Sequence, residues 1–420
     1  MTWVNWSGSQ RCDPARMLAP RTRQEVAAAV VEGPAPVRVA GAGHSFSGGA
    51  ATAGTLLSLD ALDRVLDVSG ELVRVEAGIR LHALSRELLL RGLAMPNLGD
   101  IDVQSLAGAL STGTHGTGAR LPILSAQVES VELVLADGSE RAIGGGEELA
   151  AARVSLGALG VIVAVTLRCV PAFRLHGVDA PQPLEEILDG LGERADAHDH
   201  FEFWTFPHSD VALTRINDRT DAPPSRPGRV RAYASDVLMD NHALYAVSRA
   251  ARAFPRAIPA LNRFASSAAS RRERVDWSHA VFASPRLVRF EEMEYSVPRE
   301  RAAEAVRAVK AILERHPVSF PIELRFVRGD DVLLSPASGR DSAYLAIHLF
   351  EGMPYEAPFR EVEALLSSAF EGRPHWGKRS FLSADELAPR YAGWDAFQRV
   401  RAQLDPHGRF ANAWTRHVLG

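Results

Sequence analysis

The chain has 420 residues, of which 46% are hydrophobic and 23% are charged, and its formal net charge is -4. This length exceeds one ordinary domain and this composition is globular, which excludes a disordered or fibrous chain and predicts two domains. The mildly acidic balance excludes a nucleic-acid-binding protein, and no apolar run approaches the roughly 20 residues of a membrane span, so we expect a soluble protein with a small-molecule substrate.

The N-terminal segment and the cysteines predict the cellular compartment. The first twelve residues, MTWVNWSGSQRC, lack the charged start and the apolar core of a secretory signal. Cys12 and Cys169 are the only cysteines. Two cysteines are too few to stabilise a chain of this size by disulfide bonds or to form a thiolate metal site alone. We therefore expect a reducing, cytoplasmic compartment.

Residues 37 to 170 are predicted to form mainly strands, such as 37–40 and 55–59. The dipeptides Ser69-Gly70 and Asp137-Gly138 predict hairpin turns. One helix is expected to interrupt the strands at residues 81–92, because apolar residues recur there at helical spacing and Gly92 stands where a C-cap belongs. The pattern predicts an α+β domain.

A glycine-rich loop, Gly41-Ala-Gly-His-Ser-Phe-Ser-Gly-Gly49, follows the first of these strands. Its small residues allow backbone N–H groups to converge on an anion such as a phosphate. Phe46 stands where a Rossmann fingerprint needs a third glycine, so a nicotinamide dehydrogenase is a poor interpretation. For this loop alone, a tight structural turn remains an equal alternative.

Two further segments of small residues strengthen the prediction of a large cofactor. Residues 104–118 combine glycines, hydroxyl groups and one histidine, which can present many donors to a pyrophosphate or a flavin ring. Residues 155–162 are small and apolar and lead into a predicted strand at 163–167, where they could lie against an adenine. Each segment could be a turn, but three in one domain are better explained by one cofactor.

A second region begins near Ala172, where helical patterns at 183–191 and 300–315 alternate with apolar strands. Residues 221–231 are predicted to be a surface loop. The Ala/Arg-rich stretch 244–274 is interpreted as a solvated face or a lid, and peripheral contact with a membrane is the less favoured alternative. His198 and His200 lack a third partner, so we predict no metal site.

Seven segments, in order, resemble the flavoenzyme family that includes vanillyl-alcohol oxidase, in its sugar-acid branch of aldonolactone oxidases and dehydrogenases and alditol oxidases. The resemblance covers nearly the whole chain. The segments are Gly41-Ala-Gly-His-Ser-Phe46, Ser105-Leu-Ala-Gly108, Gly113-Thr-His-Gly116, Leu156-Gly-Ala-Leu-Gly-Val161, Glu323-Leu-Arg325, His375-Trp-Gly-Lys378 and Phe410-Ala-Asn412.

The resemblance implies an α+β fold of three parts. A two-subdomain FAD-binding domain of the PCMH type would span residues 1–174, and a central α+β cap domain with an antiparallel sheet would span 175–374. A C-terminal segment, 375–420, would return to the FAD-binding domain.

The resemblance also implies which residues hold FAD. In this branch the histidine of the Gly-His-Ser motif, here His44, commonly carries the flavin through a covalent bond to its 8α-methyl group, and a neutral imidazole in a rigid loop suits that bond. Noncovalent FAD is the alternative. The residues expected at the cofactor are Gly41, Ala42, Gly43, His44, Ser45, Phe46, Ser47, Ser105, Gly108, Ser111, Gly113, Thr114, His115, Gly116, Gly160, Val161, Ile162 and Lys378.

By the same resemblance Glu323, Arg325 and Lys378 are the catalytic residues, and they bind the substrate together with Ser105 and His348. Hydride transfer to flavin N5 calls for fixed cations, because negative charge develops on the flavin and on the substrate oxygen. We assign Arg325 to the developing alkoxide, Glu323 to a substrate hydroxyl, and Lys378 to the reduced flavin or the alkoxide.

The spacing of Glu323 and Arg325 suits a strand, where residues two apart face the same side. A surface ion pair of little energetic consequence is the competing interpretation. The surrounding run 320–327 is apolar, so a charged pair within it needs partners or a cavity, and a functional placement is favoured.

The cap segments 201–208, 290–298 and 342–348 look most like the aldonolactone enzymes. We therefore expect oxidation of an L-gulono-, L-galactono- or D-arabinono-1,4-lactone, with oxygen or another molecule as electron acceptor. An alditol oxidase, which converts a polyol such as xylitol or sorbitol to the aldose and releases hydrogen peroxide, is the closest alternative. A flavin or sugar carrier without turnover is a third possibility, which the charged residues 323, 325 and 378 disfavour.

Overall fold

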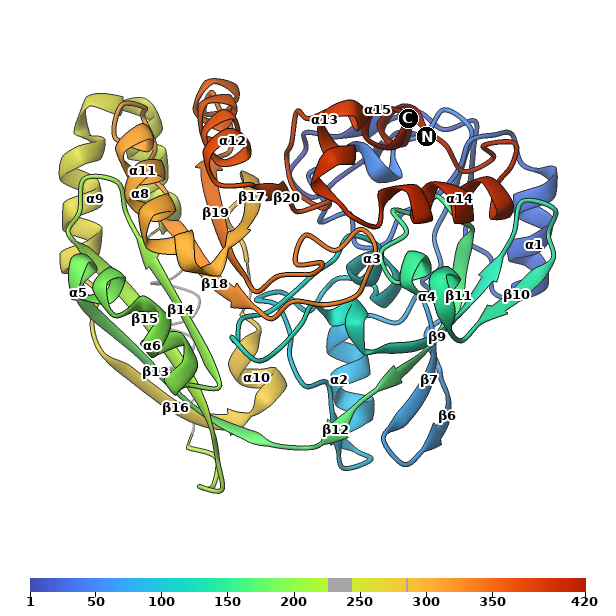
Figure 1. Ribbon diagram of the computed structural model, residues 1–420, viewed down its shortest axis with the longest axis horizontal. Helices are drawn as coiled ribbons and strands as arrows, with labels where there is room; N and C mark the ends of the chain where they lie inside the picture. The colour runs from blue at the N-terminus through green and yellow to red at the C-terminus, as the bar shows by residue number, and fades with distance from the viewer. Residues whose placement is uncertain (226–243, 285) are drawn as a thin grey trace.

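Figure 1 shows the computed structural model of the protein, which describes residues 1–225, 244–284 and 286–420. Two lobes lie side by side, and both chain termini lie on the same lobe. A short N-terminal hairpin of β1 (Trp3–Val4) and β2 (Arg11–Cys12) precedes the first of these lobes.

The first lobe contains a small parallel sheet in the order β3 (Arg16–Leu18), β5 (Thr55–Leu57) and β4 (Val37–Val39). Helix α1 (Arg23–Glu32) covers it and begins at Thr22, whose side chain accepts a hydrogen bond from the Glu25 N–H. Val26 and Val30 of this helix pack with Val37 and Leu57 in a hydrophobic cluster. The packing fixes the strand that leads into the glycine-rich loop.

A five-stranded antiparallel sheet forms the rest of the first lobe. Gly70 and Gly138 have positive φ angles of 60° and 83°, and both predicted hairpins are confirmed. The strand order is β10 (Glu140–Ile143), β9 (Val128–Val134), β11 (Val161–Arg168), β7 (Leu72–Glu76) and β6 (Val65–Ser69).

Three α-helices, rather than the single predicted helix, lie between residues 37 and 170. Helix α2 (Leu81–Leu89) confirms the prediction. Helices α3 (Leu106–Ser111) and α4 (Gly146–Ala152) were not expected, and the expectation of one helix is wrong. Ser105 caps α3 by accepting the Gly108 N–H, and Leu106 and Leu110 are buried. The glycines around α3 favoured a loop in the sequence-based prediction, so its short apolar stripe was not recognised as a helix.

The second lobe is built on an eight-stranded antiparallel sheet. Its edge near the first lobe carries β20, and helices cover the face turned away from that lobe (Figure 1). The strand order is β16 (Arg272–Trp277), β13 (Arg174–Pro183), β15 (Val211–Thr220), β14 (His200–Thr205), β18 (Ile322–Val327), β19 (Ser342–Phe350), β17 (Phe290–Pro298) and β20 (Arg373–Pro374). Together with the first lobe, this sheet confirms the α+β class and the antiparallel cap sheet.

The helices of the second lobe match the predicted helical patterns within a few residues. The pattern at 183–191 corresponds to α5 (Leu184–Asp189), followed by α6 (Leu191–Ala197), and the pattern at 300–315 corresponds to α11 (Ala302–Leu313). Helix α12 (Glu356–Ala369) packs against α11. The small α10 (Ser278–Phe282) and the strand pair β8 (Leu93–Ala94) and β12 (Val170–Pro171) lie where the lobes join.

The Ala/Arg-rich stretch 244–274 contains α8 (Leu244–Ala253), α9 (Ile258–Ser267) and the start of β16. Phe254 and Phe264 are 70% and 67% exposed on it. The predicted surface loop 221–231 lies mainly outside the described residues. In the described ranges, no helix combines the length and the apolar character needed to span a membrane.

The C-terminal segment lies over the first lobe (Figure 1). It contains α13 (Ala384–Leu387), α14 (Trp394–Leu404) and α15 (Ala413–Leu419). Asn412 donates to the carbonyls of Gly48 and Ala51 at 2.9 Å and 2.8 Å. The chain end therefore holds the far side of the glycine-rich loop in place.

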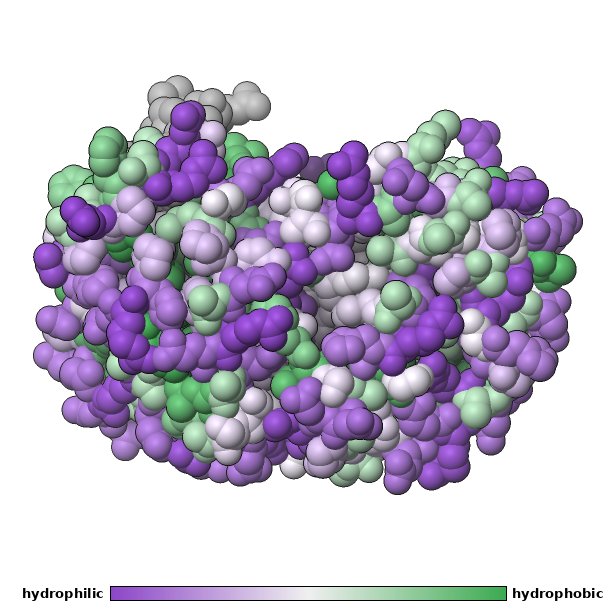
Figure 2. Space-filling view, turned by 90° about the horizontal axis from the view of Figure 1, so that it is seen from above, coloured by the Kyte–Doolittle hydropathy of each residue, from purple (hydrophilic) through white to green (hydrophobic). Residues whose placement is uncertain are grey.

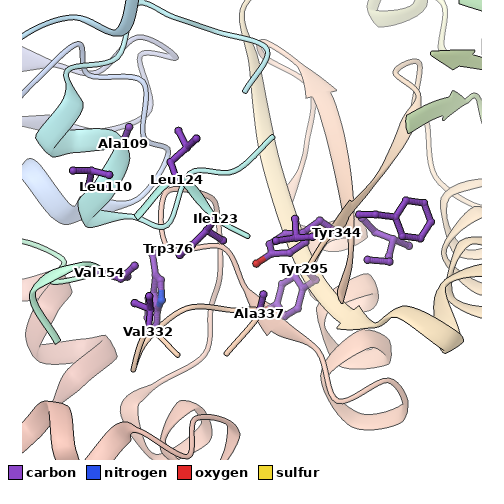
Figure 3. Packing of buried hydrophobic residues seen from close by; sticks show 14 of the residues in the cluster. Ala109, Leu110, Ile123, Leu124, Val154, Tyr295, Val332, Ala337, Tyr344 and Trp376 are labelled. Atoms are coloured by element: carbon purple, nitrogen blue, oxygen red, sulfur yellow. The ribbon is translucent and has the colours of Figure 1, made fainter. Parts of the chain in front are cut away.

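One hydrophobic cluster extends through both lobes. Figure 3 shows Ala109 and Leu110 of α3 on one side and Tyr295 and Tyr344 of the cap sheet on the other, with Trp376 among the residues between them. On the outside, hydrophilic and hydrophobic residues are interspersed over the face shown in Figure 2.

Candidate active site

A groove in the first lobe is bordered by the three segments of small residues that the sequence singled out. The space between its walls is about 1040 Å³, counting the part that is open to solvent. Most of the lining is backbone and small side chains from residues 37–50, 104–112 and 156–162, and Phe410 and Trp414 close it from the C-terminal segment.

The glycines allow two walls of the groove to approach each other. A Cβ atom on Gly41 would overlap the Ser105 Oγ at the start of α3, and a Cβ on Gly160 would come within 2.9 Å of the Val134 carbonyl. Gly43 and Gly157 have φ angles of 70° and 64°, which L side chains rarely adopt. The result is a narrow cradle lined by backbone groups, which fits an extended dinucleotide such as FAD.

Arg38 holds three walls of the groove together. Its guanidinium donates to the carbonyls of Gly49 (2.6 Å), Leu156 (2.7 Å), Gly157 and Phe410 (both 2.8 Å). Burial lowers the pKa of Arg38 to about 10, against the opposing effect of Asp405, so the side chain stays a cation at neutral pH. Arg38 was not predicted from the sequence, although one charged residue within the apolar strand β4 is a recognisable signal.

His44 lines the groove from the glycine-rich loop. Burial, together with the positive charges of Lys378 and Arg80, lowers the pKa of His44 to about 4. The imidazole is therefore neutral near pH 7 and can act as a nucleophile.

Most of the residues expected at the cofactor line the groove. These are Gly41, Ala42, Gly43, His44, Ser45, Ser47, Ser105, Gly108, Ser111, Gly160, Val161 and Ile162. The structure does not place Phe46, Gly113, Thr114, His115, Gly116 or Lys378 among the lining residues.

The segment from Gly113 to Gly116 packs between the lobes instead. A Cβ on Gly116 would overlap the side chain of Asn97, and the His115 imidazole is buried 3.2 Å from Glu294 of the cap sheet. The Gln104 side-chain amide donates a hydrogen bond to the Thr114 hydroxyl at 3.3 Å. Close packing between the lobes accounts for these small residues, and their contact with the cofactor stays a prediction.

Arg325 and Glu323 lie on β18 with both side chains buried, and the Arg325 Nε donates to the Glu323 Oε1 at 2.6 Å. Arg325 also pairs with Asp100 of the first lobe at 2.6 Å and with Glu202 of the neighbouring strand β14 at 3.0 Å. Burial alone would lower the pKa of Arg325, but the surrounding carboxylates raise it well above its ordinary value. This is a buried charge network and not a surface ion pair.

Lys378 and His348 form the adjoining part of this network. Lys378 pairs with Glu292 of β17, and His348 Nε2 lies 3.4 Å from the same carboxylate and 3.9 Å from Glu323. Burial alone would lower the pKa of His348, but Glu292 and Glu323 raise it above its ordinary value. Lys378 and His348 therefore share the Glu292 carboxylate, and His348 also lies close to Glu323.

The charge network adjoins the His44 end of the groove. The Lys378 ammonium lies 5.4 Å from the centre of the Phe46 ring, two residues from His44, and the Phe46 N–H donates to the Gly377 carbonyl at 2.7 Å. Lys378 is also one of the charges that lower the pKa of His44. The predicted catalytic residues and the predicted flavin-bearing residue thus lie together, at the junction of the lobes.

Three acids that hold the cationic groups were also not predicted from the sequence: Asp100, Glu202 and Glu292. Glu202 is the only acid in the largely aromatic strand β14, where a lone acid signals a buried partner, whereas Glu292 is one of three acids in β17. Asp100 follows a turn between β8 and α3, and nothing in its local sequence indicates its partner on β18.

The histidines at 198 and 200 are held apart by different partners. His198 lies 2.8 Å from Asp218, whereas His200 is buried 2.8 Å from the Thr117 carbonyl. Within the described ranges, two other groups of possible metal ligands are close together: His115, Glu294 and His375, and Asp100, Glu202 and Glu323. In the second group the Arg325 guanidinium pairs with all three carboxylates. The absence of a metal remains a prediction.

Comparison with known proteins identifies both parts of the chain. A family model described as D-arabinono-1,4-lactone oxidase matches residues 165–418, and one described as FAD binding domain matches residues 14–144. The cholesterol oxidase of B. sterolicum has the same fold, with a TM-score of 0.83 at 19% identity over 100% of this chain and 96% of that one.

Three curated relatives are similar over nearly their whole length. The L-gulono-1,4-lactone dehydrogenase of Mycobacterium tuberculosis is 44% identical, covering 100% of this chain and 99% of the relative. The L-gulonolactone oxidase of Mus musculus is 34% identical, covering 99% and 97%. The alditol oxidase of a Streptomyces species is 34% identical, covering 99% and 98%.

Proposed function

The chain belongs to the D-arabinono-1,4-lactone oxidase family of FAD-dependent oxidoreductases, and on that premise we propose that it oxidises a sugar-derived 1,4-lactone by hydride transfer to flavin N5. The substrate is an L-gulono-, L-galactono- or D-arabinono-1,4-lactone. One observation carries the proposal: Arg325, Glu323, Lys378 and His348 form a buried charge network beside the His44 end of the groove.

FAD bound in the groove would supply the two-electron acceptor. Arg325 stabilises the negative charge that develops on the substrate oxygen, and Glu323 accepts a hydrogen bond from a substrate hydroxyl. Lys378 places a second positive charge at the same end of the groove. His348 and Ser105 orient the sugar ring. Because these groups are held in place by buried ion pairs, little reorganisation is needed as charge develops.

We further propose that FAD is attached covalently through His44. The neutral imidazole at the groove wall supports this, because only the unprotonated nitrogen is nucleophilic. Acid denaturation of the purified protein should leave the flavin on the polypeptide by intact mass and visible absorbance, and His44→Ala should release it. Release from both proteins would leave FAD as a noncovalent cofactor.

Anaerobic bleaching of the flavin tests the reaction and separates the candidate substrates. We expect the three lactones to reduce the flavin faster than xylitol or sorbitol. Faster reduction by the polyols would favour the alditol oxidase, which the 34% identical alditol oxidase relative supports. No reduction by any of them would indicate a carrier without turnover.

Arg325 is the residue whose replacement tests the mechanism. Arg325→Lys keeps the charge but loses the planar fork, and we expect flavin reduction to slow by about 10²-fold or more with FAD still bound, the loss typical of one transition-state donor. A reduction rate near that of the wild type would contradict the role of Arg325. Reoxidation of the reduced protein by oxygen and by an artificial acceptor then identifies an oxidase or a dehydrogenase.

A cytoplasmic location is also proposed. Cys12 and Cys169 are both free thiols, and Cys169 is buried, as suits a reducing compartment. Fractionation of cells that express the protein checks this location.

A further inference from the structure

The N-terminal hairpin packs against the loop that carries His44. The Trp6 N–H donates to the Gly43 carbonyl at 2.8 Å, and the Asn5 side-chain amide donates to the Ser45 carbonyl at 3.0 Å. These two carbonyls belong to the residues directly before and after His44. The hairpin therefore fixes the backbone on both sides of this histidine.

The Trp6 indole also contacts the His44 side chain. The two rings are stacked, with their centres 5.0 Å apart and 21° between their planes. In the part of the chain that the structure describes, no side chain or backbone group forms a hydrogen bond with a ring nitrogen of His44. Among the ring contacts of the described residues, the stack on Trp6 is the one that involves the His44 imidazole.

Trp6 is itself held from other directions. Its ring meets Phe46 edge-on at 6.4 Å and Phe290, the first residue of β17, at 5.3 Å and 74°. An indole that packs on both the loop and the cap sheet has little freedom to tilt. It can therefore serve as a rigid surface for the imidazole.

We propose that Trp6 is a positioning residue for flavin attachment, which holds the His44 imidazole in the plane from which its nitrogen reaches the flavin 8α carbon. The inference rests on the covalent link proposed above. A ring that rotates freely is aligned for bond formation only part of the time, so removal of the stacked partner slows attachment.

The attachment step balances with an oxidant that the proposed function already supplies. A C–N bond forms between His44 and the 8α carbon, while one C–H bond of the methyl group and one imidazole N–H bond break. The two hydrogens and the electron pair would be left on the flavin ring, from which the two-electron acceptor of the proposed reaction, oxygen or another molecule, removes them.

Two variants of similar volume test the role of Trp6 in the full-length holoprotein. Trp6→Phe keeps a flat aromatic face, and Trp6→Leu keeps an apolar side chain without one. Total bound flavin is measured by absorbance, and the attached fraction by intact mass after acid denaturation. We expect equal total flavin in both, an attached fraction near wild type for Phe, and a fraction about fivefold lower for Leu, as the loss of one aromatic pair implies.

Trp277→Leu is the matched control. Trp277 lies on β16 of the second lobe beneath the Arg174 guanidinium and does not line the groove, so its replacement should leave unchanged the fraction of bound flavin that is attached. Equal attachment in Trp6→Leu and wild type would overturn the inference, as would a Trp6→Leu protein that binds no flavin. Acid release of flavin from the wild type would end both this inference and the covalent link, while bleaching by lactones would still support the oxidoreductase.

Discussion

The Arg325 guanidinium pairs with the buried carboxyl groups of Glu202 and Glu323 and with the partly buried Asp100. Burial raises the pKa of Glu202 well above its ordinary value, against the opposing charge of Arg325. Burial would also raise the pKa of Asp100, but Arg325 and Arg286 lower it below its ordinary value. Near pH 7 we therefore expect Asp100 to be charged and Glu202 to hold a proton, which limits the excess of negative charge around Arg325.

Asp100→Asn and Glu202→Gln should lower the free energy of unfolding by different amounts, although both replace an acid by its amide beside the same guanidinium. Asp100→Asn removes a charge partner of Arg325 and Arg286, so we expect a loss of about 3 kcal/mol in the free energy of unfolding. Glu202→Gln resembles the protonated acid and should cost less than about 1 kcal/mol. Urea denaturation at pH 7 measures both, and equal losses would contradict the assigned protonation states.

His375 makes the stability of the protein depend on pH. Burial, aided by the charges of His115 and Lys378 and opposed by Glu294, lowers the pKa of His375 to about 3, and its Nδ1 accepts the Gly377 N–H at 3.0 Å. The unfolded chain protonates this side chain near its ordinary pKa of about 6.5. Stability contributed by the neutral imidazole is therefore complete above pH 6.5 and is lost as the pH falls toward 3.

His375→Gln should remove this dependence while keeping a hydrogen-bond acceptor. Between pH 7 and pH 5 we expect the free energy of unfolding of the wild type to fall by about 2 kcal/mol more than that of the variant. Denaturant unfolding at the two pH values provides the comparison. A parallel decrease in the two proteins would show that His375 is protonated in the folded state.

Among the elements, the turn after β4 and the start of α3 determine the width of the cofactor groove. Gly41 lies at the end of the strand and Ser105 caps the helix, and only a hydrogen in place of a side chain at residue 41 leaves room for the Ser105 hydroxyl. Neither element alone defines this restriction, because the two lie more than sixty residues apart in the sequence.

Gly41→Ala should therefore reduce FAD retention. The added Cβ overlaps the Ser105 Oγ and must push the loop away from α3, so we expect the purified variant to carry much less flavin than the wild type, by absorbance against protein. Gly49→Ala is the control, since Gly49 also lines the groove but its Cβ would meet Trp414 at an ordinary contact distance of 3.4 Å. Equal flavin loss in the two variants would show that the overlap is not the cause.

At the scale of the whole molecule, the two lobes share one core. The Thr117 hydroxyl donates to the Phe201 carbonyl and accepts the Phe326 N–H at 3.2 Å, which joins the segment after α3 to two strands of the cap sheet. Hydrophobic residues continue through the same junction (Figure 3). Separation of the lobes would expose this core, so we expect them to unfold together.

Calorimetry should show a single unfolding transition for the holoprotein. Thr117→Val leaves two buried backbone groups without a partner, at a cost of about 1–3 kcal/mol, and should lower the transition temperature by several degrees. Two well-separated transitions in the wild type would show that the lobes unfold independently and that the shared core contributes little.

The sequence by itself determined the features that depend on short-range spacing. The glycine-rich loop and the small residues at 104–118 and 155–162 predicted a cofactor groove, because close backbone approach requires small residues locally. Glu323 and Arg325 were predicted to act together because the period of a strand places alternate residues on one face. The FAD-binding domain and the family follow from these segments and their order along the chain.

Only the tertiary structure decided which distant groups complete the site. Asp100 reaches Arg325 across 225 positions, Glu202 faces Arg325 through the order of the cap strands, and Trp6 covers His44 through a hairpin at the chain's start. The packing of the segment from Gly113 to Gly116 between the lobes was likewise not predicted from the sequence. Spacing along the chain specifies backbone conformation, whereas buried ion pairs and ring contacts depend on which elements fold against one another, and that partnership is not encoded locally.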